Sequence, residues 1–148
     1  MLWLLYRQRL REKGNYFMTP DEWLGNEAVR WLQHAAKDRH AAQVLVELEP
    51  SRSVFHSQQA AEKAEKAFLT ILQIPFRKTH DLAELGVQCG SADPSLKPIV
   101  EDAENLSRYA STFRFPDEAY EPDKYDAAEA LAIADKVYPE IRRRVEAR

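Results

Sequence analysis

The alanine pattern of residues 53–74 constrains the fold more than any other feature of the sequence. Small and large apolar residues recur there at helical spacing and form one arc: Ala60, Ala61, Ala64, Ala67, Phe68 and Ile71. Pro75 follows the last of them and cannot continue a helix. The pattern predicts an amphipathic helix from Ser53 to Ile74.

Two further long helices are predicted, one in the first third of the chain and one in the last third. The first runs over 20–47, where Thr19, Pro20 and Glu22 form a capping-box start and the Glu49-Pro50-Ser51 turn marks the end. The last begins near Pro122-Asp123 and continues through Val137, and Pro139 is expected to kink or break it.

Two more helices are predicted between these segments. A short one follows the N-cap Thr79, runs through Asp81–Leu85 toward Cys89, and has Gly90 as its stop signal. Another opens at Asp93-Pro94 and extends to Ala110, with Pro98 delaying its regular start. Because no run of alternating β-branched residues appears, we expect an all-α, antiparallel up-and-down helical bundle of four long helices and a short one.

The composition fits one globular domain with a substantial core. The chain has 148 residues, of which 45% are hydrophobic, and its net charge of −3 argues against a protein that coats nucleic acid or anionic membranes. No apolar stretch is long enough to span a membrane. The single cysteine, Cys89, cannot form an internal disulfide and is expected to be a small buried residue, so we expect a reducing, cytoplasmic location.

The first 17 residues differ from the rest of the chain. Four basic residues and one acidic residue give them a charge of +3, which leaves −6 for residues 18–148. Since Met18 directly precedes the helix-start signal at Thr19, we hypothesise that the natural protein begins at Met18 and that residues 1–17 are an N-terminal extension. Mass spectrometry of the natively expressed protein tests this hypothesis, and an intact residue 1 or 2 would contradict it.

The common catalytic and metal-binding signatures are absent from the sequence. No histidine has Glu three residues before it, and no His-Glu-x-x-His or Gly-x-Ser-x-Gly motif occurs. Four glycines are too few for a phosphate-binding loop or a dinucleotide fingerprint. We therefore predict neither catalytic residues nor a metal site.

A polar stripe, defined by Gln59, Glu62, Lys63 and Lys66, occupies one third of the circumference of the predicted 53–74 helix. An amide, a carboxylate and two ammonium groups on one face can bind and orient an anion. The alternative is a solvated face on which Glu62 and Lys66 form an i,i+4 pair that contributes a few tenths of a kcal/mol.

Three motifs resemble those of the HEPN (higher eukaryote and prokaryote nucleotide-binding) domain family. They are Gln59-Ala-Ala-Glu-Lys-Ala-Glu-Lys66, Lys78-Thr-His-Asp-Leu82 and Arg114-Phe-Pro116. The segments 31–38 and 125–130 also correspond, and the likeness spans about 18–145 in the expected order. Phe115 stands where this subgroup often has Tyr, and Arg39 where Leu is common.

The resemblance implies a helical bundle that forms a homodimer and partners a minimal nucleotidyltransferase, in some systems of toxin–antitoxin type. Many relatives are ribonucleases with Arg and His separated by four to six residues. This spacing is absent here, because Arg30–His34 and Arg52–His56 have three intervening residues and Arg77–His80 has two. The likeness is therefore to the non-nuclease, nucleotide-binding branch, with ATP or another nucleotide and Mg²⁺ as the expected ligand.

The resemblance also implies which residues bind the nucleotide: Gln59, Lys63, Lys66, His80 and Arg114. The lysines suit phosphate oxygens, Gln59 suits a base edge or the ribose, and Arg114 suits either a phosphate or an intrachain clamp to Glu62. For Glu62 we expect a structural ion pair rather than Mg²⁺ binding, and for His80 a local structural role. Aromatic residues are expected in the core or a dimer interface, namely Trp23, Trp31, Phe68, Phe113 and Tyr125. By analogy with the family, Tyr120, Tyr125 and Tyr138 are possible acceptors of a nucleotide modification.

Two alternatives remain open at this point. In the first, the polar stripe is the interface of a protein-interaction module and no nucleotide binds. In the second, a ribonuclease uses displaced residues such as Arg77 and His80, with its site assembled across a dimer axis.

Overall fold

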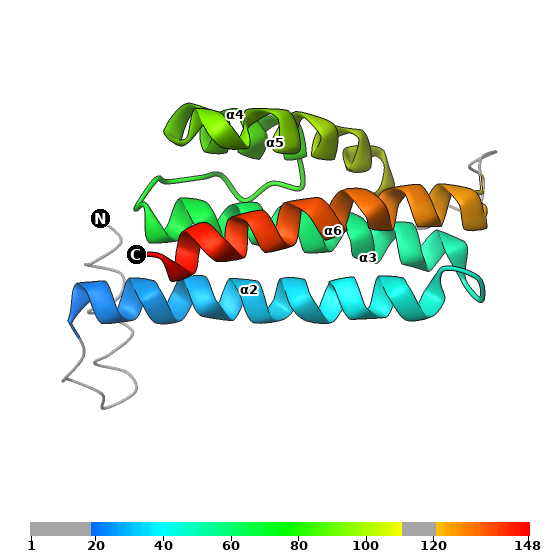
Figure 1. Ribbon diagram of the computed structural model, residues 1–148, viewed down its shortest axis with the longest axis horizontal. Coiled ribbons are helices and arrows are strands. Elements are labelled where there is room, and N and C mark those ends of the chain that lie inside the picture. Colours follow the sequence, from blue (N-terminus) through cyan, green and yellow to red (C-terminus); the bar gives the residue numbers. More distant parts are fainter. Residues whose placement is uncertain (1–18, 111–120) are drawn as a thin grey trace.

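The computed structural model describes residues 19–110 and 121–148 (Figure 1). Its elements are α2 (Pro20–Leu45), α3 (Pro50–Ile71), α4 (Leu82–Ala92), α5 (Lys97–Ala103) and α6 (Lys124–Glu146), with 3₁₀ segments η1 (Pro94–Leu96) and η2 (Glu104–Ala110). The described residues contain no strand, which confirms the all-α prediction.

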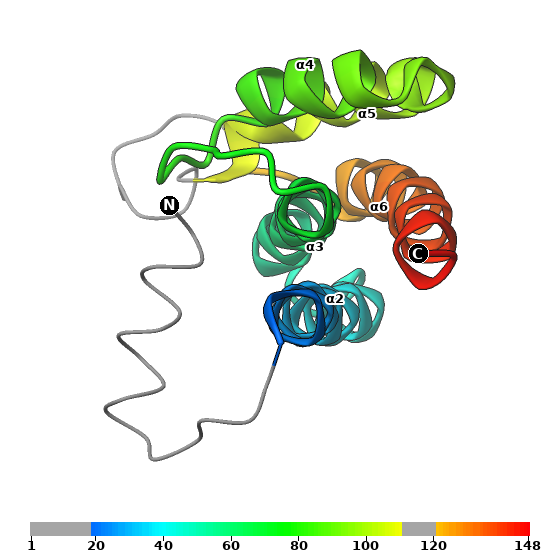
Figure 2. The same ribbon diagram turned by 90° about the vertical axis from the view of Figure 1, so that its left-hand side faces the viewer.

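Helix α3 is the central element of the bundle. Helices α2, α3 and α6 run side by side, and α4 and α5 form a separate layer over α3 and α6 (Figures 1 and 2). In Figure 1, α3 and α6 run in the same direction and α2 runs opposite to both. Fourteen of the 22 residues of α3 are buried, because α2, α4, α6 and η2 all pack against it.

The start signals of α2 and α6 were predicted correctly, whereas α3 begins at Pro50, three residues before the predicted Ser53. The Thr19 hydroxyl accepts from the Glu22 amide at 3.2 Å, and the Glu22 carboxylate accepts from the Thr19 amide at 2.8 Å, which completes a capping box. Asp123 caps α6 in the same way with Asp126. Pro50 lies at the first turn of α3, so the turn that ends α2 also begins the next helix.

The predicted number of long helices was wrong. The segment expected to form one helix from Asp93 to Ala110 forms η1, α5 and η2, so the described residues contain three long and two short α-helices. Pro94 and Pro98 each lie in the first turn of their own element, where a missing amide is tolerated. Two prolines four residues apart thus start two short elements instead of one long one.

Three smaller predictions about helix ends were also wrong. The N-cap of α4 is Asp81, and Thr79 instead accepts from the Asp81 amide at 3.0 Å. Gly90 lies inside α4, packed against Lys97, and does not end the helix. Pro139 does not break α6, because its exposed ring lies opposite the buried residues Val137 and Ile141, which hold both halves of the helix on the core.

Helix α3 ends three residues before the predicted Ile74. Gln73 adopts a positive φ of 57°, its amide donates to Thr70 O at 3.0 Å, and the Ile74 amide donates to Leu69 O at 2.9 Å. These two bonds are a Schellman ending, in which glycine usually takes the left-handed position. The chain reverses there and runs back beside α3.

The core combines alanines with many larger side chains, such as Phe68 and Leu69. Phe68 and Cys89 are buried as predicted, and Trp31 packs against the core. Tyr125 is 73% exposed and therefore not a core residue of this chain. Phe113 and residues 1–17 lie outside the described residues. None of the described helices is both long and apolar enough to cross a membrane.

We expect Gln73→Gly to raise the free energy of unfolding by about 1 kcal/mol, since glycine adopts the left-handed conformation without steric cost. Denaturant unfolding measures the change. Gln33→Gly, on the exposed side of α2, is the matched control and should lower stability by about 1 kcal/mol. A loss of stability in both variants would contradict the Schellman ending at Gln73.

Candidate functional site

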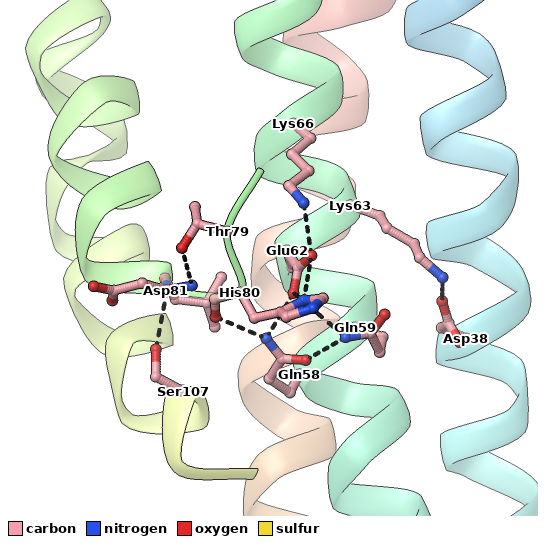
Figure 3. A network of polar contacts seen from close by, with 11 residues as sticks. Asp38, Gln58, Gln59, Glu62, Lys63, Lys66, Thr79, His80, Asp81 and Ser107 are labelled. Carbon is pink, nitrogen blue, oxygen red and sulfur yellow. Dashed lines mark hydrogen bonds and ion pairs between the residues drawn. The ribbon is translucent and has the colours of Figure 1, made fainter. Parts of the chain in front are cut away.

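The Glu62 carboxylate is the centre of a buried polar network on α3 (Figure 3). Its Oε1 accepts from Lys66 Nζ at 2.8 Å, and both of its oxygens lie 3.1 Å from His80 Nδ1. Its Oε2 also accepts from the Gln58 amide at 2.9 Å and the Gln59 amide at 3.3 Å. We call Glu62, Gln58, Gln59, Lys66 and His80 the Glu62 cluster.

His80 reaches Glu62 from outside the helix. The reversal at Gln73 sends residues 73–81 back along α3, where the His80 carbonyl accepts from Gln58 Nε2 at 3.3 Å. The Asp81 side chain then caps α4 by accepting from the Ala83 amide, and Thr79 braces the Asp81 amide (Figure 3). Contacts of His80 with α3, and of its neighbours Thr79 and Asp81 with the start of α4, therefore fix the position of His80.

Lys66 is enclosed inside the protein. Its side chain is 8% exposed, and its ammonium lies 5.5 Å from the Trp31 ring centroid and 5.9 Å from that of Phe76. The two rings meet edge to face. The Glu62 carboxylate and the two aromatic rings together offset the cost of burying the charge.

Lys63 belongs to a different cluster, between α3 and α2. Its ammonium bonds Asp38 Oδ2 at 2.5 Å, while His56 Nδ1 lies 2.8 Å from Asp38 Oδ1. Figure 3 shows Lys63 pointing to α2, away from Lys66 and His80. We call Asp38, His56 and Lys63 the Asp38 cluster.

The structure therefore brings together Gln59, Lys66 and His80 of the predicted site, places Lys63 on the neighbouring α2 side, and leaves Arg114 outside the described residues. The alternative of a solvated face is wrong for two of its four residues, because Glu62 is 2% exposed and Lys66 is 6% exposed. The i,i+4 pair of Glu62 and Lys66 exists, but it is buried.

Several polar atoms of these clusters remain available to a ligand. The Gln59 side chain makes two hydrogen bonds, and Nε2 is the donor in both. Its Oε1 therefore has no partner among residues 19–110 and 121–148. Within the same residues, Nε2 of neither His56 nor His80 is hydrogen-bonded. These atoms form the accessible edge of the network, while Glu62 and Lys66 form its interior.

Glu65 lies one turn from Glu62 and is completely buried. Neither of its carboxyl oxygens has a hydrogen-bond partner within the described chain. Burial raises the pKa of Glu65 well above its usual range, and the charges of Glu62 and Glu104 raise this pKa further. Glu65 is therefore a carboxyl group whose charged form the interior disfavours. Burial, with Glu65 adding to it, also raises the pKa of the Cys89 thiol, so Cys89 is not a reactive nucleophile.

The displaced ribonuclease pair does not come together in this fold. The Arg77 guanidinium bonds the Glu84 carboxylate on α4 through two contacts of 2.6 and 2.8 Å, whereas His80 faces Glu62. This ion pair raises the pKa of Arg77 and lowers that of Glu84.

A hollow of about 490 Å³ between α2 and α6 contains none of the predicted site residues. It is lined by Arg39, Tyr138, Pro139, Arg142, Arg143, Glu146 and Ala147. Its three arginines pair with Asp135, Glu146 and Glu140. Their charges are thus already balanced by acidic neighbours.

Sequence reasoning did not assign Asp38, His56 or Gln58 to a site. His56, Gln59 and Lys63 follow each other at spacings of three and four, so helical periodicity alone groups His56 with the polar stripe. Asp38 gives no such signal, because its proximity to Lys63 depends on how α2 packs against α3. Within the described part of the chain, no group of three acidic, histidine or cysteine residues is arranged to hold a metal.

Comparison with known proteins identifies one family. The family model of the HEPN domain matches residues 28–144, more than three quarters of the chain. No curated protein and no solved structure matches the chain.

We expect Lys66→Ala to lower the free energy of unfolding by about 3–5 kcal/mol, because Glu62 is then a buried charge without its ammonium partner. Lys63→Ala should cost less, since Lys63 lies nearer the surface. Denaturant unfolding compares the two variants. Equal and small losses would contradict the importance of the buried pair.

We expect Glu65→Gln to flatten the dependence of stability on pH. Because its folded-state pKa is raised, Glu65 contributes stability fully below its unfolded pKa, and this contribution is lost as pH rises toward the folded pKa. The difference between wild type and variant should therefore grow in favour of Glu65→Gln from acid to neutral pH. Unfolding curves across this range measure it, with the exposed Glu101→Gln as the control that leaves the profile unchanged.

Proposed function

Because the chain belongs to the HEPN domain family, we propose that it is a nucleotide-binding accessory partner of a minimal nucleotidyltransferase. It acts as a homodimer in a two-component system of toxin–antitoxin type. The observation that carries the proposal is the accessible edge of the Glu62 cluster. There Gln59 and His80 present ligand-binding atoms while the buried Glu62 carboxylate holds both side chains in place.

The chemistry of this edge suits the uncharged part of a nucleotide. Gln59 Oε1 accepts hydrogen bonds, as a base amino group or a ribose hydroxyl requires. Its amide nitrogen bonds Gln58 and Glu62, which fixes the orientation of the group before any ligand arrives. A preorganised acceptor binds with a smaller loss of side-chain entropy than a mobile one.

Lys66 and Glu62 have a supporting role in this proposal. Glu62 already accepts from Lys66 and from the Gln58 and Gln59 amides, and His80 lies against both of its oxygens. It has little capacity left for Mg²⁺, which demands a near-octahedral oxygen shell. Any Mg²⁺ therefore arrives with the phosphates of the nucleotide, and we propose that Arg114, which lies outside the described residues, contacts those phosphates.

Of the two candidate tyrosines that the structure describes, one is suited to receive a nucleotide from the transferase. Tyr125, in the first turn of α6, is 73% exposed, whereas Tyr138 is 8% exposed and lies beneath the Arg39 guanidinium. If the partner modifies one of these two tyrosines, Tyr125 is the acceptor, and the third candidate, Tyr120, lies outside the described residues.

A protein-interaction module is the second candidate, and one observation favours it. Both lysines of the polar stripe are paired with a carboxylate, so the face carries less free positive charge than the sequence suggests. A complex with the transferase whose affinity does not change with nucleotide supports this candidate instead.

Calorimetric titration of the full chain with ATP and Mg²⁺ tests the proposal. We expect a micromolar dissociation constant, about −8 kcal/mol, and a loss of tenfold or more in Lys63→Ala. Lys37→Ala, an exposed lysine of α2, is the matched control and should bind like the wild type. If the folded wild-type chain binds no ATP, the nucleotide-binding proposal is wrong and the interaction module replaces it.

A further inference from the structure

The Asp38 cluster has the arrangement of an oriented imidazole. With Asp38 ionised beside Lys63, its oxygens only accept hydrogen bonds, so His56 Nδ1 carries the hydrogen that faces Oδ1 at 2.8 Å. The same bond fixes the ring plane and directs Nε2 away from the carboxylate. The His56 side chain is 29% exposed, so a ligand can approach it from solvent.

Lys63 is the accessible lysine of the polar stripe. Its side chain is 23% exposed, against 8% for Lys66, and only one of its three ammonium hydrogens is used by Asp38. Lys66 is closed in by Glu62 and two aromatic rings. An anion reaches Lys63 without breaking a buried ion pair.

His56 and Lys63 flank Gln59 on one face of α3. Gln59 lies three residues after His56 and four before Lys63, and residues at these spacings are surface neighbours on a helix. Gln59, whose Oε1 is an acceptor, is therefore a helix neighbour of two residues whose side chains can bind phosphate through an imidazole and an ammonium.

We propose that His56 and Lys63, both held by Asp38, bind the phosphate groups of a nucleoside polyphosphate. In the imidazolium form, His56 Nδ1–H stays on Asp38 while Nε2–H donates to a phosphate oxygen, and Lys63 donates to another. Asp38 is a positioning residue that keeps both donors on one side of the ligand. This inference rests on the proposed function and assigns the phosphate end of that site to the α2–α3 face.

A metal is a poor occupant of the same place. The ammonium of Lys63 repels a cation, and the Asp38 carboxylate is already used at both oxygens. One ring nitrogen alone does not hold a divalent ion, whose sites use several ligands.

The test compares ATP with inorganic tripolyphosphate on the full chain. His56→Ala should weaken binding of both ligands about tenfold, whereas Gln59→Ala should weaken ATP alone, because tripolyphosphate has no base or ribose. His40→Ala, an exposed histidine of α2, is the matched control for removing an imidazole. Circular dichroism confirms that each variant is folded.

The outcomes show whether this inference fails alone or together with the proposed function. If ATP binds and His56→Ala matches the wild type, the inference is wrong and the nucleotide proposal stands. If tripolyphosphate binds through His56 but ATP does not bind, the cluster binds polyphosphate without a nucleoside, and both the inference and the nucleotide proposal are wrong. If neither ligand binds, both are wrong.

A spectroscopic readout on the wild-type chain distinguishes contact from support. Imidazole ¹⁵N spectra should show His56 with its hydrogen on Nδ1 before ligand is added, and tripolyphosphate should then shift Nε2 more than Nδ1. Asp38→Asn should disturb the starting tautomer. An unchanged Nε2 in the bound protein means that His56 has only a structural role, which would overturn the inference.

Discussion

The organisation of the candidate site depends on one buried carboxylate, Glu62. An ionised group in the interior is tolerated only when it is paired and hydrogen-bonded, and Glu62 meets this condition through Lys66, His80 and the amides of Gln58 and Gln59. Each of these partners is thereby fixed in turn. Glu62 also explains part of the raised pKa of Glu65, because a negative charge one turn away disfavours a second negative charge in the same interior.

The environments of His56 and His80 are chemically alike. Asp38 binds Lys63 and His56, and Glu62 binds Lys66 and His80. In each case the carboxylate takes one ammonium and the Nδ1 side of an imidazole, which leaves Nε2 available. The difference is burial: the lysine at Glu62 is enclosed by aromatic rings, while the lysine at Asp38 remains accessible. Burial therefore distinguishes an enclosed lysine from an accessible one, although the sequence presents the two alike.

The fold could be predicted from the sequence wherever local rules decide. The capping boxes at Thr19 and Asp123 and the alanine periodicity of α3 depend only on residues within a few positions. The end of α3 could not be predicted, because Gln73 takes a left-handed conformation that usually calls for glycine. The division of the 93–110 segment into three short elements could not be predicted either, because each of its two prolines is compatible with a helix start.

The polar stripe shows why a helical projection finds a site but not its interior. Periodicity groups Gln59, Glu62, Lys63 and Lys66 on one side of α3, but packing divides them, since Lys63 pairs with Asp38 on α2 and Lys66 pairs with Glu62. Which of them is buried depends on neighbours far along the chain: Asp38 lies 25 residues before Lys63, and His80 lies 18 residues after Glu62. The proposed phosphate ligand requires charge that is both fixed and accessible, so this proposal depends on how α2 and residues 73–81 pack against α3.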